Sequence, residues 1–555
     1  MRDQHAPGLS PGTSVSLAGL LDEYTATARA TGPVRALRGL RKHLERLPAE
    51  AWRDCARALI ARNNPEAAAA LLESAGAARA RPEFVLTLAE ALGAAGETAR
   101  AEEIVRPLLP ARDAALALAA LLRGQGRMRA AAALLADPAA AESGAAAAAD
   151  YGRFLMSCGQ EAAARALCER ALEAAPAAHA DTAPLLAMAG LLDIALGDFA
   201  RGRERLLEAM RSGLDRERWQ LAPSLAEAQR YDDAQHPDLA LFESRLARAP
   251  EASAERASLL FALAKAHDDL GRYERAAALY REANGLVARR TPWSRERWRE
   301  WIDLQLAWPA PVAPATVAPA GMTPVFIVGM PRSGTTLLAE VLGRHPGVRN
   351  RGELGVVPAL RHWLALPARS ENPAAVATAR GRLLAQLRQD DEPANWFVDK
   401  NPLNFRYLGL VAALAPESRV IYCRRNLRDT ALSIWKQYFA QPDAGYAYAF
   451  EFMTDLFDSC AEMILHWQAT LELPILTVDY ELMVGAPEVA AARIAEFLGM
   501  GNFKLAQAAP RAEGAIGTAS RWQARQPIYQ RSVGAWRSYA PFVPELERFF
   551  PDSSF

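Results

Sequence analysis

The chain has 555 residues, with 64 Lys plus Arg and 64 Asp plus Glu, so its formal net charge is zero. This balance argues against non-specific nucleic-acid binding, which needs an excess of cations along the phosphate backbone. The length exceeds what one hydrophobic core supports, so two or more domains are expected. Five cysteines, an odd number without a CxxC pair, argue against a disulfide scaffold and a zinc site.

The N-terminus, MRDQHAPGLSPG, lacks the basic start and the apolar run of a signal peptide. The sequence also shows no apolar stretch of about 18 residues, the length expected of a transmembrane helix. We therefore expect a cytoplasmic protein without a membrane span.

Residues 17–300 are rich in Ala, Leu, Arg and Glu, which are strong helix formers. One pattern recurs in this range: a helix, a turn, and a second helix with an Ala-rich face. The expected turn residues are Gly96, Gly126, Gly159, Gly197 and Gly271, with Asn63 and Asn64 in an earlier copy. The first four glycines are 30, 33 and 38 residues apart, and a period near 34 is typical of tetratricopeptide repeats. We predict a helical-repeat solenoid whose role is not written in the sequence.

A Pro- and Ala-rich segment, WPAPVAPATVAPAGMTP, follows the repeats and favours an extended spacer. We place a linker at 301–323 and a second domain at 324–555. In that domain the short apolar runs VFIVG, WFVD, RVIYC and PILTVDY alternate with helical stretches. This alternation predicts an α/β domain with a parallel sheet.

The first apolar run leads into the loop MPRSGTTL, at 330–337, and then into a helix. Backbone N–H groups of such a loop, with the positive end of the helix, form an anion cradle. The candidate phosphate-binding residues are Arg332, Ser333, Gly334, Thr335 and Thr336. Gly334 permits a close backbone approach, and Arg332 supplies a forked set of donors. A nucleotide kinase or NTPase would carry Lys where Thr335 stands, so the loop favours a donor with a different terminal group.

The motif PRSGTTL resembles the 5′-phosphosulfate loop of sulfotransferases that use 3′-phosphoadenosine 5′-phosphosulfate (PAPS). Together with the repeats, it makes the chain similar to the bacterial tetratricopeptide-repeat sulfotransferases, whose catalytic half is related to the protein-tyrosine sulfotransferases. The resemblance covers essentially the whole chain and is strongest over 323–545. It implies PAPS as co-substrate, 3′-phosphoadenosine 5′-phosphate (PAP) as product, and no metal.

A second phosphate motif is expected in RVIYCRRNLRDTALSIWKQYF, a strand followed by a helix. The family's 3′-phosphate motif has an Arg at a strand end and a Ser eight residues later, a spacing that Arg425 and Ser433 match. Arg binds a phosphate dianion through two parallel hydrogen bonds, and Ser donates a third. Arg424 and Arg428 are further candidates for the same anion.

The resemblance also implies the catalytic groups. Glu353, in HPGVRNRGELGVV, aligns with the catalytic base that takes the acceptor proton. Lys400, just past a predicted strand, is expected to stabilise the oxygen that bridges sulfur and the leaving phosphate, and Arg332 shares that task. The neighbouring Asp399 is assigned no metal.

Three further contacts to the nucleotide are implied in the C-terminal part. Tyr480 is expected to contact the nucleotide, Ser520 a phosphate, and Trp522 or Tyr529 the adenine. The sequence departs from the family at Ala535, where relatives carry a basic residue. It departs again at Gly355, where tyrosine-sulfating relatives have Arg, which puts tyrosine specificity in question.

These features predict a sulfotransferase that moves a sulfuryl group from PAPS to an acceptor hydroxyl. Protein tyrosine, glycan, lipid and small phenol remain open as acceptors, and the repeats hint weakly at docking of a peptide or protein. Two alternatives stay open: a P-loop kinase or NTPase, and a repeat scaffold with an inactive sulfotransferase domain.

Overall fold

The computed structural model describes residues 16–136, 144–174, 182–212, 214, 219, 221–308, 321–439, 444–501 and 530–551. Contacts divide the chain into two compact units, Met1–Gln125 and Gly126–Phe555. Among the described residues, no helix has the length and apolar character needed to cross a membrane.

The first unit is helical. Its helices are α1 (Leu17–Thr31), α2 (Pro33–Leu44), α3 (Ala49–Ala61), α4 (Pro65–Glu73), α5 (Pro82–Ala95), α6 (Thr98–Val105) and α7 (Arg112–Gly124), with the short 3-10 helices η1 (Gly76–Ala80) and η2 (Arg106–Leu108). They pack as pairs, α1 with α2, α3 with α4 and α5 with α6. Small buried residues, such as Ala56 and Ala68, let the paired helices approach closely.

The second unit begins with further helices of the same kind. They are α8 (Met128–Leu135), α10 (Ala145–Ser157), α11 (Glu161–Ala174), α12 (Ala183–Leu196), α13 (Phe199–Arg211), α15 (Leu221–Glu227), α16 (Pro237–Leu246), α17 (Ala254–Asp269), α18 (Tyr273–Arg290) and α19 (Arg295–Leu306). A Cβ at Gly152 of α10 would lie 2.8 Å from Cys168 Sγ of α11, so this crossing requires glycine.

All the expected turn residues except Asn64, whose φ is −125°, have the positive φ of the left-handed backbone region that ends a helix. Their φ angles are 60° at Asn63, 103° at Gly96, 75° at Gly126, 70° at Gly159, 94° at Gly197 and 71° at Gly271. The predicted helix–turn–helix organisation of the N-terminal region is therefore confirmed.

Helix α19 begins within the predicted repeat range 17–300 and continues into the range 301–323 that we assigned to the linker. It runs to Leu306, so residues 301–306 of the range assigned to the linker are helical. The cause is tertiary packing: Ile302 is fully buried, and the Trp298 indole N–H donates to Ser459 Oγ of α26 (Phe450–Thr470; 3.0 Å).

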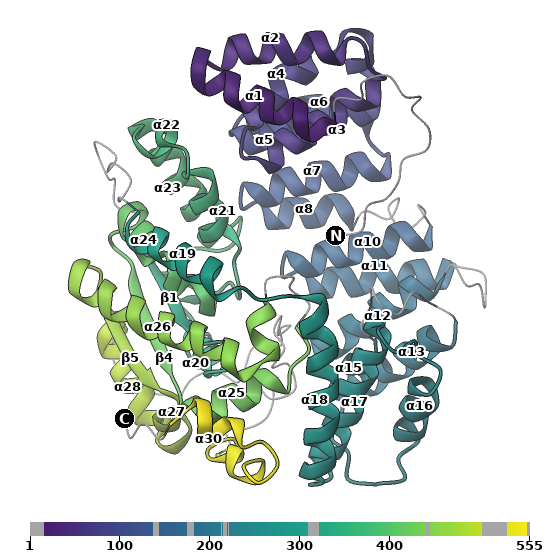
Figure 1. Ribbon diagram of the computed structural model, residues 1–555, viewed down its shortest axis with the longest axis vertical. Coiled ribbons are helices and arrows are strands. Elements are labelled where there is room, and N and C mark those ends of the chain that lie inside the picture. Colours follow the sequence, from purple (N-terminus) through teal and green to yellow (C-terminus); the bar gives the residue numbers. More distant parts are fainter. Residues whose placement is uncertain are drawn as a thin grey trace. The chain divides into compact units, whose positions relative to one another are not determined.

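The second unit then forms a five-stranded parallel sheet, as predicted (Figure 1). Its strands are β1 (Thr323–Gly329), β2 (Val348–Asn350), β3 (Trp396–Asp399), β4 (Arg419–Arg424) and β5 (Ile475–Asp479), in the order β2-β3-β1-β4-β5. The apolar residues of β1 are fully buried, as expected for a central strand covered on both faces.

The helices around the sheet are α20 (Thr335–Leu342), α21 (Val356–Trp363), α22 (Pro367–Ser370), α23 (Pro373–Arg388), α24 (Leu408–Leu414), α25 (Leu427–Trp435), α26 (Phe450–Thr470), α27 (Tyr480–Gly485), α28 (Pro487–Leu498) and α30 (Glu545–Phe549), with the 3-10 helices η4 (Pro402–Tyr407), η5 (Ala444–Tyr448) and η7 (Ala535–Ser538). Residues of α20, α27 and α28 share a hydrophobic core with β1, β3, β4 and β5. Strand β1 has β3 on one side and β4 on the other, so the chain changes direction at β1. Ligand sites of open α/β sheets form at such a point, at the carboxyl ends of the strands.

Candidate active site

The loop after β1 has a backbone suited to anions. Arg332 and Gly334 have positive φ angles, 68° and 102°, and Gly334 is the N-cap of α20. Thr335 and Thr336 are the first two residues of that helix, so their N–H groups belong to its first turn. Ser333 is 1% exposed, and its Oγ has no hydrogen-bond partner among the described residues.

Gly334 is required for a reason that the sequence did not reveal. A Cβ at this position would lie 2.4 Å from Cδ2 of Tyr480, the first residue after β5. The group that lies close to the Gly334 backbone in this structure is therefore the Tyr480 ring. The guanidinium of Arg425 lies over the same ring, 4.5 Å from its centroid, which links Tyr480 to the second predicted phosphate motif.

The two phosphate motifs meet directly, although they are about 100 residues apart in the sequence. Arg332 Nε donates to Ser433 Oγ (3.1 Å), and Arg425 Nη1 donates to the Arg332 carbonyl (2.9 Å). Arg425 Nη2 donates to the Ser532 carbonyl (2.7 Å), whereas its buried Nε has no hydrogen-bond partner among the described residues. Ser433, expected beside Arg425, thus contacts the arginine of the first motif.

The other two arginines of this region have structural partners. Arg424 makes two hydrogen bonds to Asp479, of 2.7 and 3.1 Å. Arg428 Nε donates to the Phe550 carbonyl (2.7 Å), and its guanidinium lies 4.4 Å from the Trp536 ring centroid. Both side chains fasten neighbouring segments, a role that the sequence motif did not indicate.

The turn that contains Ala535 is held by a carboxylate. Asp429 of α25 accepts hydrogen bonds from the backbone N–H groups of Gly534 (2.7 Å) and Trp536 (2.9 Å). This contact fixes the segment beside the second phosphate motif without a basic residue at 535. Ser520, Trp522 and Tyr529, the other predicted contacts, lie outside the described residues.

Glu353 and Lys400 form an ion pair between the segments that follow β2 and β3. Lys400 Nζ donates to Glu353 Oε1, and the Lys400 backbone N–H donates to the Gly352 carbonyl (2.7 Å), which prolongs the pairing of the two strands. The Lys400 side chain is 2% exposed, while that of Glu353 is 41% exposed. The Glu353 carboxylate is therefore partly exposed to solvent, whereas the Lys400 ammonium group that pairs with it is buried.

Asp399, which precedes Lys400, supports the segment that carries Glu353. It is fully buried, and its carboxylate accepts hydrogen bonds from the Leu354 N–H (3.1 Å) and from Asn404 Nδ2 (2.9 Å). Burial raises the pKa of Asp399 from 3.8 to about 7, although both hydrogen bonds and Lys400 oppose the shift. We did not foresee this role; the available signal was an acid at the end of a buried strand, next to a lysine.

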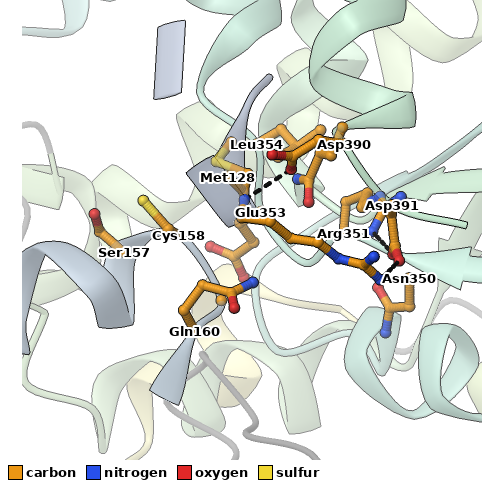
Figure 2. A pocket seen from close by; sticks show the side chains of 13 residues that line it. Met128, Ser157, Cys158, Gln160, Asn350, Arg351, Glu353, Leu354, Asp390 and Asp391 are labelled. Atoms are coloured by element: carbon orange, nitrogen blue, oxygen red, sulfur yellow. Dashed lines mark hydrogen bonds and ion pairs between the residues drawn. The ribbon is translucent and has the colours of Figure 1, made fainter. Parts of the chain in front are cut away.

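A cavity of about 360 Å³ lies beside Glu353 (Figure 2). Its lining comes from residues 350, 351, 353, 354 and 389–391 of the sheet domain, from the start of α8 at 128–129 and from the turn at 157–160. Among the described residues, no group of three or more His, Cys, Asp or Glu side chains could hold a metal ion.

Two groups of residues thus line one edge of the sheet. Arg332, Gly334, Arg425, Ser433 and Tyr480 gather at the ends of β1, β4 and β5. Glu353 and Lys400 stand at the ends of β2 and β3. These features define a parallel α/β domain in which the loop between β1 and α20 lies at the switch point of the sheet.

Comparison with known proteins identifies the kind of domain. Residues 324–504 match the sulfotransferase family. An uncharacterized protein of Aquifex aeolicus is 29% identical over 313 residues, which are 53% of this chain and 41% of that protein.

Animal relatives match a shorter stretch. The protein-tyrosine sulfotransferase of Drosophila melanogaster is 31% identical over 122 residues, 20% of this chain and 24% of the relative. Protein-tyrosine sulfotransferase 1 of Danio rerio is 30% identical over 122 residues, 20% and 34% of the two chains. The match spans less than half the length of each of these three relatives. A solved structure of Naa15/Naa10 bound to HypK-THB aligns over 96% of this chain and 73% of its own at 13% identity, with a TM-score of 0.23, too low to carry an argument.

Proposed function

We propose that the chain transfers a sulfuryl group from PAPS to an acceptor hydroxyl and releases PAP and a sulfate ester. The observation that carries this proposal is the direct contact between the two phosphate motifs, Arg332 with Ser433 and Arg425 with the Arg332 carbonyl. A nucleotide with phosphates on both its 5′ and its 3′ positions needs two anion sites close together. The sulfotransferase family match over residues 324–504 supports the same assignment.

The polar atoms of the two motifs fit such a nucleotide. Ser333 Oγ in the first motif and Arg425 Nε in the second are buried and have no hydrogen-bond partner among the described residues. Buried polar atoms without partners are rare in folded proteins and call for an explanation. Phosphate oxygens accept hydrogen bonds from both a hydroxyl and a guanidinium. We assign the 5′ end to the Arg332–Thr336 loop and the 3′-phosphate to Arg425, with Ser433 bridging the two motifs.

Glu353 is proposed as the base. Its exposed carboxylate accepts the acceptor's proton while the acceptor oxygen attacks sulfur. Lys400 holds that carboxylate through the ion pair, and Asp399 holds the backbone beside it through the Leu354 N–H. The base is therefore fixed by two partners that are themselves buried, which keeps the cost of orienting it low.

Arg332 and Lys400 are proposed to stabilise the charge that develops on the leaving phosphate. This division makes Glu353 the proton acceptor and the two cations the electrostatic stabilisers.

Turnover of labelled PAPS tests this function. The full chain is incubated with ³⁵S-PAPS and a mixture of hydroxylated acceptors that includes tyrosine peptides, since two relatives are named protein-tyrosine sulfotransferases. We expect PAP and a labelled sulfate ester in amounts above that of the enzyme. Preference for Mg-ATP, with phosphate transfer, would instead indicate a kinase or NTPase, and no turnover of either nucleotide would indicate a repeat scaffold.

A further inference from the structure

The cavity beside Glu353 is built by two distant parts of the second unit. On one side stand the turn between α10 and α11, residues 157–160, and the start of α8. On the other stand residues 350, 351, 353, 354 and 389–391 of the sheet domain. Figure 2 shows Ser157, Cys158 and Gln160 on one side of Glu353 and Arg351 with Asp391 on the other. The helical repeats thus form part of the wall around the candidate base.

Specific contacts hold this wall in place. Asp390 accepts hydrogen bonds from the backbone N–H groups of Arg129 (2.7 Å) and Ala130 (2.9 Å), in the first turn of α8. Asp391 binds both the Arg129 guanidinium (2.6 Å) and the Arg351 guanidinium (2.9 Å). A carboxylate at a helix N-terminus is a favourable contact. The repeat side is therefore a fixed part of the cavity and not a loose cover.

The lining is polar and carries little unbalanced charge. Nine of the thirteen lining residues have side chains that form strong hydrogen bonds, and none of these thirteen is aromatic. The two arginines among them are both paired with Asp391, and Glu353 is paired with Lys400. A phenol ring is bound best by apolar and aromatic walls, and an anionic acceptor would need cations without partners. Neither requirement is met by this cavity.

We propose that this cavity binds the acceptor, that the acceptor is a neutral polyhydroxyl group such as a sugar, and that Gln160 of the repeats helps to recognise it. The inference rests on the proposed function. Gln160 is half-buried and offers an amide that both donates and accepts hydrogen bonds, as vicinal hydroxyls require. In the reaction, an oxygen–sulfur bond forms at the sugar hydroxyl, the bond from sulfur to the leaving phosphate breaks, and the hydroxyl proton moves to Glu353.

Ligand-observed NMR on the full, PAP-loaded chain tests this inference without turnover. The probes are methyl glycosides of neutral hexoses and of N-acetylhexosamines, with N-acetyltyrosinamide as the aromatic competitor. We expect at least one glycoside to bind and the substitution Gln160→Met, which keeps the length but removes the amide, to weaken its binding about fivefold. Arg272→Met is the matched control, because Arg272 follows the turn glycine of another helix pair and is not among the lining residues.

The outcomes separate this inference from the proposed function. Binding of N-acetyltyrosinamide without any glycoside, no glycoside binding at all, or equal glycoside affinity in the wild type and Gln160→Met would each overturn the sugar-binding inference. Failure to load PAP, measured beforehand by calorimetry, would instead overturn the proposed function.

Discussion

Glu353 and Lys400 illustrate what a motif can and cannot indicate about single residues. The resemblance assigned them separate tasks, and the structure joins them in one ion pair. The supporting roles of Asp399, Asp429 and Asp479 were not predictable, because these carboxylates act through contacts that depend on the folded chain. A local sequence pattern identifies the residue types that chemistry needs, whereas the groups that orient them follow from tertiary packing.

Glu353→Gln removes the proposed base while keeping the size of the side chain. We expect kcat to fall by a factor of about 10²–10⁴, the usual contribution of a positioned general base, with PAP affinity unchanged within about twofold. Steady-state PAPS turnover and PAP calorimetry measure the two quantities. Glu392→Gln, at an exposed glutamate, is the control. Full activity of Glu353→Gln would refute the assignment.

Asp399 makes stability depend on pH. Below pH 3.8 the Asp399 carboxyl is protonated in both the folded and the unfolded chain. As the pH rises towards 7, this carboxyl ionises in the unfolded chain before it ionises in the folded chain. The stability that Asp399 contributes is thus fully present below 3.8, declines up to about 7, and is constant above.

Asp399→Asn mimics the protonated form and removes this dependence. Asn404 Oδ1 is buried without a hydrogen-bond partner among the described residues, so an amide flip would satisfy the new Nδ2. The free energy of unfolding of the wild type, relative to Asp399→Asn, should decline between pH 4 and 7 by up to about 1.4 kcal/mol per pH unit. Urea unfolding across this range measures the difference, and a difference that does not vary with pH contradicts the account.

At the scale of elements, the four apolar runs correctly predicted β1, β3, β4 and β5, whereas β2 and the last six residues of α19 were not foreseen. Strand β2 has three residues, Val348–Asn350, too few to show a periodic pattern. Helix α19 packs on α26, and this packing continues the helix six residues past the boundary that we drew at residue 300. The turn glycines, in contrast, were predictable because a positive φ limits the choice of residue.

Gly334→Ala tests the contact between the phosphate loop and α27. A positive φ costs an alanine about 1–2 kcal/mol, and the clash with Tyr480 adds to this. Gly499→Ala, also at positive φ but with nothing within 4 Å of the added Cβ, should show the backbone cost alone. Gly334→Ala should therefore lose more stability than Gly499→Ala. This extra loss should be smaller when Gly334→Ala is made in a Tyr480→Ala background, since the clash is then absent. Equal effects of Gly334→Ala and Gly499→Ala on urea unfolding would disprove the steric account.

Asp390→Ala removes the carboxylate at the N-terminus of α8. We expect a loss of about 0.5–2 kcal/mol in the free energy of unfolding, the range measured for helix caps. Glu392→Ala, two residues away, is the control and should change little. If both variants unfold at the same urea concentration, Asp390 does not cap α8.

At the scale of the whole molecule, the order of the two regions, helices first and a parallel sheet afterwards, was predicted correctly from composition and periodicity. The cavity wall formed by residues 157–160 was not predictable, because these residues precede Arg351 and Glu353 by about 190 positions in the sequence. The chain combines an α/β domain that matches the sulfotransferase family with helices that help to enclose Glu353, the candidate base.

Selective binding of a nucleotide with two phosphate ends is the central claim. Calorimetry without Mg²⁺ compares PAP with adenosine 5′-phosphate, which lacks the 3′-phosphate, in the wild type and in Arg425→Met. We predict that the wild type binds PAP at least tenfold more tightly, since hydrogen bonds to charged groups are strong, and that Arg425→Met loses this preference but still binds adenosine 5′-phosphate. Equal affinity of the wild type for the two nucleotides would contradict the account.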